Sequence, residues 1–532
     1  MGPEQIGVSV SEIMKGSGRA SRRLVTFLET MKNKHTGLLL LLLFIGFSLR
    51  IYDLGGESIW FDEGASIYFA KKNVSEIFSM KESSPPLYYI VLHWWINLFG
   101  DSEFSVRLPS VIFAFFSIAM MYVVGKQLFG SEAGLVSALL LALSRFHILY
   151  SQEARTYSLS ALLTLLSMYF LIELMNDRSR KNLLGYVLSS CLLMYSHIYG
   201  LFIIIAQNIY FVTQTVLARE ARAVNLKKWI LIQMALLGLF APWAKVFFGQ
   251  VMGVVQSDPG GTAMVRPSTA TIIDTFSAYF LFSGRLSYLF FLVPFLSVLR
   301  LERISGKIEW RGFFRSLDAL RWKVQLVDTG RFFFVAVWLL TPIIVPFLIS
   351  RSLTPIYLNR YTIVAAVAFY LLVGKGICNI QQKFVKTIAI VLVVVFSLVS
   401  LPAYYSRAKK NQWREAAHYI DANARSDDLL VVNPGECLGL VFNYYSKRAD
   451  LEKKGFPEMM PDFPNTWSSG VNEGNVAELK SMAGNYRRLW LILTPSGDRG
   501  KALVSEMLSE SFGPPSYKKY YGVDVYLYAK EK

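Results

Sequence analysis

The sequence is poor in charged residues and in cysteine. Only 17% of its 532 residues are charged, whereas soluble chains average about 25%. The three cysteines, Cys191, Cys378 and Cys437, lie far apart without a CxxC pair, so the sequence indicates neither a disulfide framework nor a zinc knuckle. The low charge argues against a soluble enzyme, and the hydrophobic content of 53% argues against a disordered chain.

The sequence contains several long apolar runs with few charged residues. One run from about Thr36 to Leu54 follows a polar, basic N-terminus, and its length fits a membrane-spanning helix. It is too long for a signal-peptide core and lacks a cleavage site of small residues, so we expect it to be retained. Further segments bring the expected total to about eleven spans: 107–125, 132–150, 156–175, 182–198, 200–217, 229–248, 284–299, 332–350, 361–377 and 386–403.

The segment from Pro85 to Phe99 is apolar but short, and whether it spans decides on which side the later loops lie. If it lies at the membrane surface, the Lys and Arg residues before Tyr404 divide into 25 on one side and nine on the other, with Arg50, Arg145 and Lys245 within spans. The positive-inside rule then places the N-terminus in the cytoplasm. Trp94 and Trp95 suit an interfacial helix. The alternative is a short tilted span that is compensated by another miscounted one.

The composition changes at Tyr404. From there to Lys532 the net charge is +2, against +15 for the preceding part, so the overall +17 forms no nucleic-acid-binding footprint. Helix-like stretches at 412–424 and 501–511 alternate with strand-like ones at 428–433, 488–494 and 524–528, which is typical of a small α/β domain. We expect a basic cytoplasmic N-terminus (1–35), a transmembrane domain (36–403) with its first external loop at about 55–106, and an extracytoplasmic domain (404–532).

The first external loop carries a pair of adjacent carboxylates, Asp62 and Glu63, beside Trp60 and Phe61. A carboxylate at the membrane surface can accept a proton from an acceptor hydroxyl or hold a divalent ion. An equally good interpretation is an acidic first turn of the following helix, which the helix dipole favours.

A second polar group interrupts two apolar segments on the same expected side. Glu153 and Arg155 are costly at this depth unless they are used, and an Arg can bind a phosphate through two donors. A mutually neutralising pair in a tight turn is the alternative. Tyr157 follows them, and His197 lies at another outer helix end, where it can be a base, a ligand or an aromatic-belt residue. A third group, Arg360 and Tyr361, can neutralise an anionic head group, although ordinary interfacial anchoring predicts similar residues.

A series of short motifs follows in a fixed order: Trp60-Phe61-Asp62-Glu63, Pro85-Pro86-Leu87-Tyr88-Tyr89, Phe99-Gly100, Arg107-Leu108-Pro109-Ser110, Phe129-Gly130 and His147 through Tyr157. Over about residues 36–200, their order and spacing resemble the bacterial and archaeal glycosyltransferases related to protein O-mannosyltransferases and lipid A aminoarabinose transferase. The resemblance extends, less specifically, to Arg360-Tyr361 and to Trp413-Arg414-Glu415-Ala416 at the start of the tail.

The resemblance implies a GT-C fold, a catalytic first external loop and a polyprenyl-phosphate sugar as donor. Asp62 would be the catalytic base with Glu63 beside it, while Arg155, Arg360 and Tyr361 would contact the donor phosphate. Many relatives have His or Lys immediately before the Pro-Pro pair, where this chain has Ser84. A cationic contact to the phosphate is then missing or supplied from elsewhere.

The sequence therefore predicts an integral membrane glycosyltransferase of a prokaryotic-type plasma membrane, which transfers a hexose or pentose to a protein, lipid or glycan acceptor on the outer face. Metal dependence differs among GT-C enzymes, and no residues of this sequence form a decisive set of metal ligands, so the need for a divalent cation is left open. The rival is a transporter or lipid flippase, but charges within spans and an internal repeat would be expected, and no repeat is found. A membrane-tethered sensor would explain the α/β domain but not the polar groups in the loops.

Overall fold

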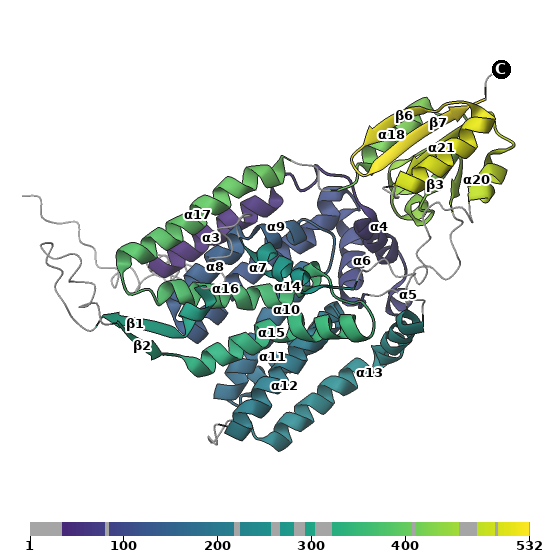
Figure 1. The fold of residues 1–532 in the computed structure, drawn as a ribbon. Coiled ribbons are helices and arrows are strands. Elements are labelled where there is room, and N and C mark those ends of the chain that lie inside the picture. The colour runs from purple at the N-terminus through teal and green to yellow at the C-terminus, as the bar shows by residue number, and fades with distance from the viewer. Residues whose placement is uncertain are drawn as a thin grey trace, which may run out of the picture.

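A bundle of long helices carries a small α/β domain at one end (Figure 1). The computed structural model describes residues 34–79, 84–217, 224–256, 266–280, 293–303, 322–406, 410–456, 476–494 and 498–530. Most of the expected N-terminal segment 1–35 and most of the expected span at 284–299 lie outside these residues. The described end of that expected span forms the short helix η2 (Val293–Ser297) and the start of strand β1 (Leu299–Arg303), which pairs with β2 (Trp322–Leu326).

Within the described residues, eight helical segments are long and apolar enough to cross a membrane. Each coincides with one of the spans expected from the sequence. They are α3 (Lys34–Ile51), α7 (Glu103–Phe129), α10 (Tyr157–Asn176), α12 (Tyr199–Leu217), α13 (Leu226–Gln256), α15 (Thr329–Ser352), η4 (Asn359–Thr362) with α16 (Ile363–Cys378), and α17 (Lys383–Tyr405).

Two other expected spans have less regular helices. The segment expected at 132–150 is α8 (Ser131–Leu143) followed by α9 (Arg145–Ser151), with a bend of 58° between them. The segment expected at 182–198 is α11 (Arg180–Ser196), whose 17 residues pack along α10. Because α11 starts with two cations and carries several serines, its hydropathy is lower than that of the other helices.

A buried arginine stabilises the break between α8 and α9. Arg50, near the end of α3, donates hydrogen bonds to the carbonyls of Ala142 at 2.9 Å and Leu141 at 3.0 Å, and its Nη2 lies 2.9 Å from Nδ1 of His147. The last carbonyls of a helix lack partners within the helix. Arg50 therefore supplies donors where α8 ends, which accounts for a fully buried charge inside an apolar segment.

Short helices fill the segment between the first two spans. They are α4 (Phe61–Ala70), α5 (Val74–Ser79) and α6 (Leu87–Phe99). The 13 residues of α6 rise by about 20 Å, which is less than the roughly 30 Å of a bilayer core. Trp94, Leu98 and Phe99 at its C-terminal half are exposed, as in a helix lying at a membrane surface. A further short helix, α14 (Thr269–Tyr279), packs against η4.

The C-terminal domain is built on a five-stranded mixed sheet of order β4-β3-β5-β7-β6. Strand β3 is parallel to β4 and β5, while β7 is antiparallel to β5 and β6. The strands are β3 (Leu429–Asn433), β4 (Glu452–Gly455), β5 (Arg488–Leu493), β6 (Ser516–Tyr520) and β7 (Val523–Ala529).

Helices cover both faces of this sheet, which explains why β3 and β5 are almost continuously apolar. Leu429 and Val431 pack with the helices α20 (Val476–Ala483) and α21 (Asp498–Phe512). Leu430 and Val432 belong to the core on the other face, which also contains Trp413 and Ile420 of α18 (Trp413–Asn423) and the single-turn η5 (Leu438–Phe442).

The C-terminal domain lies against the segment between α3 and α7, next to α4 (Figure 1). A Cβ atom added to Gly64 in α4 would lie 2.4 Å from the carbonyl oxygen of Leu440 in η5, so the two backbones touch at a position that admits only glycine. The hydroxyl of Tyr445 accepts a hydrogen bond from the amide of Ile59 at 2.6 Å. The domain and the first loop therefore share one end of the helical bundle.

Candidate active site

Asp62 lies in the first turn of α4, and its carboxylate faces Arg360. Asp62 and Glu63 are both acidic residues of this turn, so the helix-dipole interpretation of the pair also holds. The side chain of Asp62 is 14% exposed, and its Oδ2 lies 3.1 Å from Nη1 of Arg360, which is 27% exposed. Both charges face a partly open site, unlike the fully buried Glu63 beside them.

Arg155 joins this pair from the turn between α9 and α10. Its Nη1 donates long hydrogen bonds of 3.4 Å to the backbone carbonyl of Asp62 and to the hydroxyl of Ser66. Its own carbonyl accepts a hydrogen bond from Ser110 at 3.2 Å, which ties the turn to α7. All three polar groups singled out in the sequence thus meet at Asp62.

The third group brings aromatic rings to the same place. Tyr361 packs against the rings of His197 at 4.7 Å, Tyr199 at 5.6 Å and Tyr157 at 6.3 Å between centroids. The guanidinium of Arg360 lies over the ring of Tyr361 at 5.6 Å. The structure therefore brings together Asp62, Arg155, Tyr157, His197, Arg360 and Tyr361.

Several buried polar atoms of this cluster have no hydrogen-bond partner among the residues that the structure describes. They are Nε1 of Trp60, Nε of Arg155, Nε of Arg360, the hydroxyl of Tyr157, Oδ2 of Asp62 and Oε2 of Glu153. Buried polar groups are nearly always satisfied in folded proteins, and each exception calls for an explanation such as a ligand or water. Two of these six atoms are carboxylate oxygens, and the other four are donors, which suit an anionic, oxygen-rich ligand.

Glu63 lies in different surroundings from Asp62. Arg107 of α7 donates two hydrogen bonds of 2.8 Å to its carboxylate, Lys410 donates one of 2.9 Å, and the amide of Ala154 another of 3.0 Å. Burial alone would raise the pKa of Glu63, but the charges of Arg107 and Lys410 and these hydrogen bonds hold it at about 2. With four hydrogen bonds to its carboxylate and no exposed surface, Glu63 does not reach a substrate in this geometry.

Arg107 and Lys410 are functional candidates that the sequence interpretation missed. Arg107 also donates to the backbone carbonyls of Leu54 at 2.8 Å, Glu57 at 2.9 Å and Ser58 at 3.0 Å, so it fixes the loop before α4. A signal was present, because an arginine one turn inside an apolar span is costly unless it is paired. Lys410 carried no such signal, since its partners are far away in sequence.

Glu153 and His197 are buried, and burial shifts the pKa of each. Burial raises the pKa of Glu153 to about 7, with Lys410 acting against this shift and the charges of Glu63 and Asp62 adding to it. Burial and the charges of Arg155 and Arg360 lower the pKa of His197 to about 3, and its Nδ1 accepts a hydrogen bond from the amide of Tyr199. His197 is thus a neutral member of the site rather than a cation.

Ser84 is half-buried and immediately precedes the buried Pro85-Pro86 pair. The helix that follows, α6, reaches the site through Tyr88, whose hydroxyl lies 3.1 Å from the hydroxyl of Ser110 that bonds to Arg155.

The described residues contain no group of three or more His, Cys, Asp or Glu side chains arranged to hold a metal ion.

One protein family matches part of the chain. Residues 83–245 match the family described as dolichyl-phosphate-mannose-protein mannosyltransferase, a range that includes α6, Arg107, the α9–α10 turn and His197. No curated protein is a significant sequence match to the chain.

Solved structures are similar over nearly the whole chain. ArnT from Cupriavidus metallidurans in the apo state has a TM-score of 0.59 at 12% identity, covering 92% of this chain and 98% of its own. The same protein bound to undecaprenyl phosphate has a TM-score of 0.58 at 13% identity, with the same coverage. Both structures have the GT-C fold. The chain has the GT-C fold.

A different protein also has a structure similar to that of this chain. The oligosaccharyltransferase AglB from Archaeoglobus fulgidus, in complex with an inhibitory peptide and a dolichol-phosphate, has a TM-score of 0.54 at 12% identity, covering 94% of this chain and 75% of its own. The predicted fold, a polytopic helical GT-C domain with a small C-terminal α/β domain, is confirmed. Together with the apolar helices, the fold makes the chain an integral membrane protein. The family match supports the prediction of a glycosyltransferase over that of a transporter.

Proposed function

We propose that this GT-C protein transfers a sugar from a polyprenyl-phosphate donor to a hydroxyl of a protein, lipid or glycan acceptor on the extracytoplasmic face. The observation that carries the proposal is the meeting of Asp62, Arg155 and Arg360 in one partly open cluster. A base for the acceptor and two cations for the departing phosphate are the groups that such a transfer needs.

The donor phosphate would bind between the arginines. Arg155 and Arg360 each retain an unpaired buried Nε–H, and Tyr157 and Trp60 offer further donors. Charge-assisted bonds from guanidinium groups are strong and directional, and a phosphate accepts several of them. Two similar structures hold undecaprenyl phosphate or dolichol-phosphate, which supports a lipid phosphate as the ligand class.

Asp62 would act as the base. In the described geometry its carboxylate is paired with Arg360, and a phosphate that engages Arg360 would leave the carboxylate to accept a proton. The acceptor oxygen would bond to the anomeric carbon as the carbon–oxygen bond to phosphate breaks. The proton would pass to Asp62, and the lipid phosphate would leave with the bonding electron pair. A direct displacement of this kind inverts the anomeric centre.

Glu63 would support this reaction without touching the substrate. Its bonds to Arg107, Lys410 and Ala154 connect the first turn of α4 with α7, with the α9–α10 turn and with the C-terminal domain. We also infer that Tyr361 and His197 form the aromatic wall of the donor site, and that Ser84 lies where a further cation is absent.

The test is a transfer assay on the purified full-length protein with polyprenyl-phosphate sugars, with mass spectrometry of lipid and acceptor products. Asp62→Asn should lower turnover by a factor of about 100 to 10,000, because a positioned base is lost with little change in volume. Glu76→Gln, on the neighbouring helix α5, is the matched control and should be neutral. Near-normal turnover by Asp62→Asn would remove Asp62 from the role of base.

A further inference from the structure

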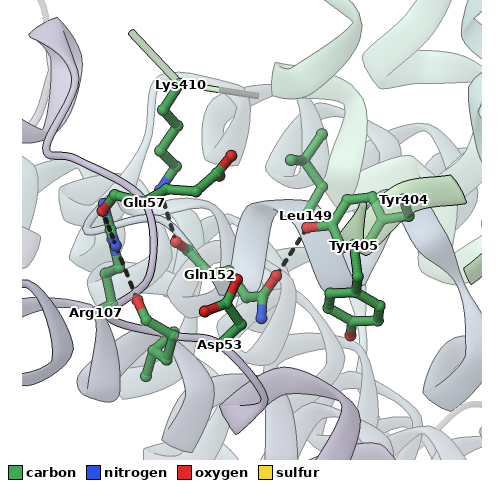
Figure 2. A pocket seen from close by; sticks show the side chains of 9 residues that line it. Asp53, Glu57, Arg107, Leu149, Gln152, Tyr404, Tyr405 and Lys410 are labelled. Carbon is green, nitrogen blue, oxygen red and sulfur yellow. Dashed lines mark hydrogen bonds between the residues drawn. The ribbon is translucent and has the colours of Figure 1, made fainter. Parts of the chain in front are cut away.

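Lys410, which lies between the last span and α18, reaches into the core next to the first turn of α4. Nζ of Lys410 donates to Oε1 of Glu63 at 2.9 Å and to the backbone carbonyl of Gln152 at 2.9 Å, and its side chain is only 7% exposed. Figure 2 shows Lys410 reaching down between Arg107 and Gln152, with Glu57 and Tyr404 on the same small polar cavity. One ammonium thus connects three segments that are distant in the sequence.

The residues after Lys410 bind the beginning of the same loop. Arg414 donates to the carbonyls of Gly55 and Gly56 and pairs with Glu103 at 3.0 Å. The hydroxyl of Ser58 donates to Glu415 at 2.9 Å and accepts from the amide of Arg414 at 3.2 Å. The sequence motif Trp413-Arg414-Glu415-Ala416, which the resemblance singled out without a role, is therefore an anchor for residues 55–58.

Neutralising Glu63 does not require Lys410. Arg107 already pairs with both oxygens of that carboxylate and balances its negative charge. Lys410 is therefore a second cation beside a single carboxylate. A buried ammonium is costly, and burial lowers the pKa of Lys410 despite the attraction of Glu63. What Lys410 adds is a geometric constraint: beside the amide of Ala154 it is a second tie between Glu63 and the α9–α10 turn that carries Arg155, and it ties both to the chain just before α18.

That constraint reaches Asp62. Asp62 and Glu63 occupy the same first turn of α4, and adjacent residues on a helix project in different directions. Holding Glu63 on one side of the helix therefore sets the rotation of α4 about its axis. The rotation in turn directs Asp62 toward Arg360 and the open part of the site.

We propose that Lys410 is a positioning residue for the transfer reaction, which holds the first turn of α4 so that Asp62 faces the donor site. The inference rests on the proposed function. It assigns to the C-terminal domain the task of ordering the catalytic loop, through Lys410 and the adjoining anchor of Arg414 and Glu415 on residues 55–58.

The experiment compares Lys410→Met, Lys410→Arg and wild type, as full-length proteins, in the transfer assay. Lys410→Met should lower kcat by roughly 10- to 100-fold, because a displacement of about 1 Å at a reacting group has this size of effect. The KM for donor should stay within about twofold, since Arg155 and Arg360 are retained. Lys410→Arg should restore part of kcat. Lys519→Met, on the exposed face of β6, is the matched control and should behave as wild type.

Hydrogen exchange of the amides of residues 55–64 gives a second measurement that needs no activity. These amides should exchange faster in Lys410→Met. Ser58→Ala, a mild change that removes the bonds to Arg414 and Glu415, decides the matter if Lys410→Met does not fold, and it should likewise lower kcat at constant donor KM. Wild-type kcat in these variants, or unchanged exchange with a raised donor KM, overturns the proposal. Absence of transfer by wild type would instead overturn the proposed function, while the exchange result would still report on the anchor.

Discussion

Nη1 of Arg360 lies 3.1 Å from Oδ2 of Asp62, although the two residues come from opposite halves of the chain. The contact places a candidate base beside a candidate phosphate ligand. In the described geometry each charge neutralises the other, so neither is buried alone. A phosphate would compete with Asp62 for the guanidinium, and donor binding would thereby prepare the base.

The two arginines should be measurable as phosphate contacts. Arg155→Ala or Arg360→Ala should weaken donor binding by about 1.5 to 3 kcal/mol, the size of a charge-assisted hydrogen bond. Arg→Lys at either position should weaken binding less, because the charge is kept and the planar two-donor fork is lost. Direct binding of a polyprenyl-phosphate sugar measures the effect. Arg351→Ala, at the C-terminal end of α15, is the control. Donor affinity indifferent to both arginines would exclude them from the site.

Ser84 offers a test by gain of function. Many of the relatives that the sequence resembles have His or Lys at this place, so Ser84→Lys should tighten donor binding or partly rescue an Arg155→Lys variant. Ser84→Thr, which adds volume without charge, is the matched control. The same donor-binding measurement applies, and weaker binding by the Lys variant alone would show that the position does not face the phosphate.

Sequence and structure agree where local physics decides the outcome. Apolar runs of spanning length within the described residues form helices, and short apolar runs in the tail, such as those of β3 and β5, form strands, because burial of such patterns depends on the pattern itself. The convergence of Asp62, Arg155 and Arg360 was suggested by their expected common side of the membrane. Their contacts could not be derived, because they depend on how distant helices pack.

Glu63 illustrates what the sequence could not supply. Its place next to Asp62 suggested a shared task, yet adjacent residues on a helix point to different surroundings. Asp62 meets Arg360, and Glu63 meets Arg107 and Lys410. The sequence pattern could show that Glu63 lies in a helix. It could not show which residues Glu63 contacts, because those contacts depend on tertiary packing.

Glu63→Gln should be a stability variant. It leaves Arg107 and Lys410 buried beside a neutral side chain, and breaking a buried ion pair in this way costs about 3 to 5 kcal/mol. The folded-state pKa near 2 lies below the ordinary value of 4.5, so wild type keeps this stabilisation above about pH 4.5 and loses it as the pH falls toward 2. Thermal unfolding in detergent measures the effect, with Glu76→Gln as the control. An unchanged melting temperature at pH 7 would contradict the role assigned to Glu63.

The positions of the two ends test the expected topology. A tag after Lys532 should be cleaved by protease added outside intact cells, and a tag before Met1 should be protected. The reason is the split of 25 against nine basic residues over an odd number of spans. Finding both tags on one side would mean that α6 spans or that another helix does not.

Glu153 should make stability depend on pH in the opposite sense to Glu63. Burial raises its folded-state pKa to about 7 from the ordinary 4.5, against the attraction of Lys410 and Arg360 and with the repulsion of Glu63 and Asp62. Between these two values the folded protein binds a proton that the unfolded chain has released, so the group's contribution to stability falls as the pH rises from about 4.5 to 7. Glu153→Gln removes this titration. Its melting temperature relative to wild type should therefore be higher at pH 8 than at pH 4.5. The exposed Glu478→Gln on α20 should show the same difference from wild type at both pH values. An equal effect of Glu153→Gln at the two pH values would mean that Glu153 is ionised throughout, held by Lys410 as a second partner of that ammonium.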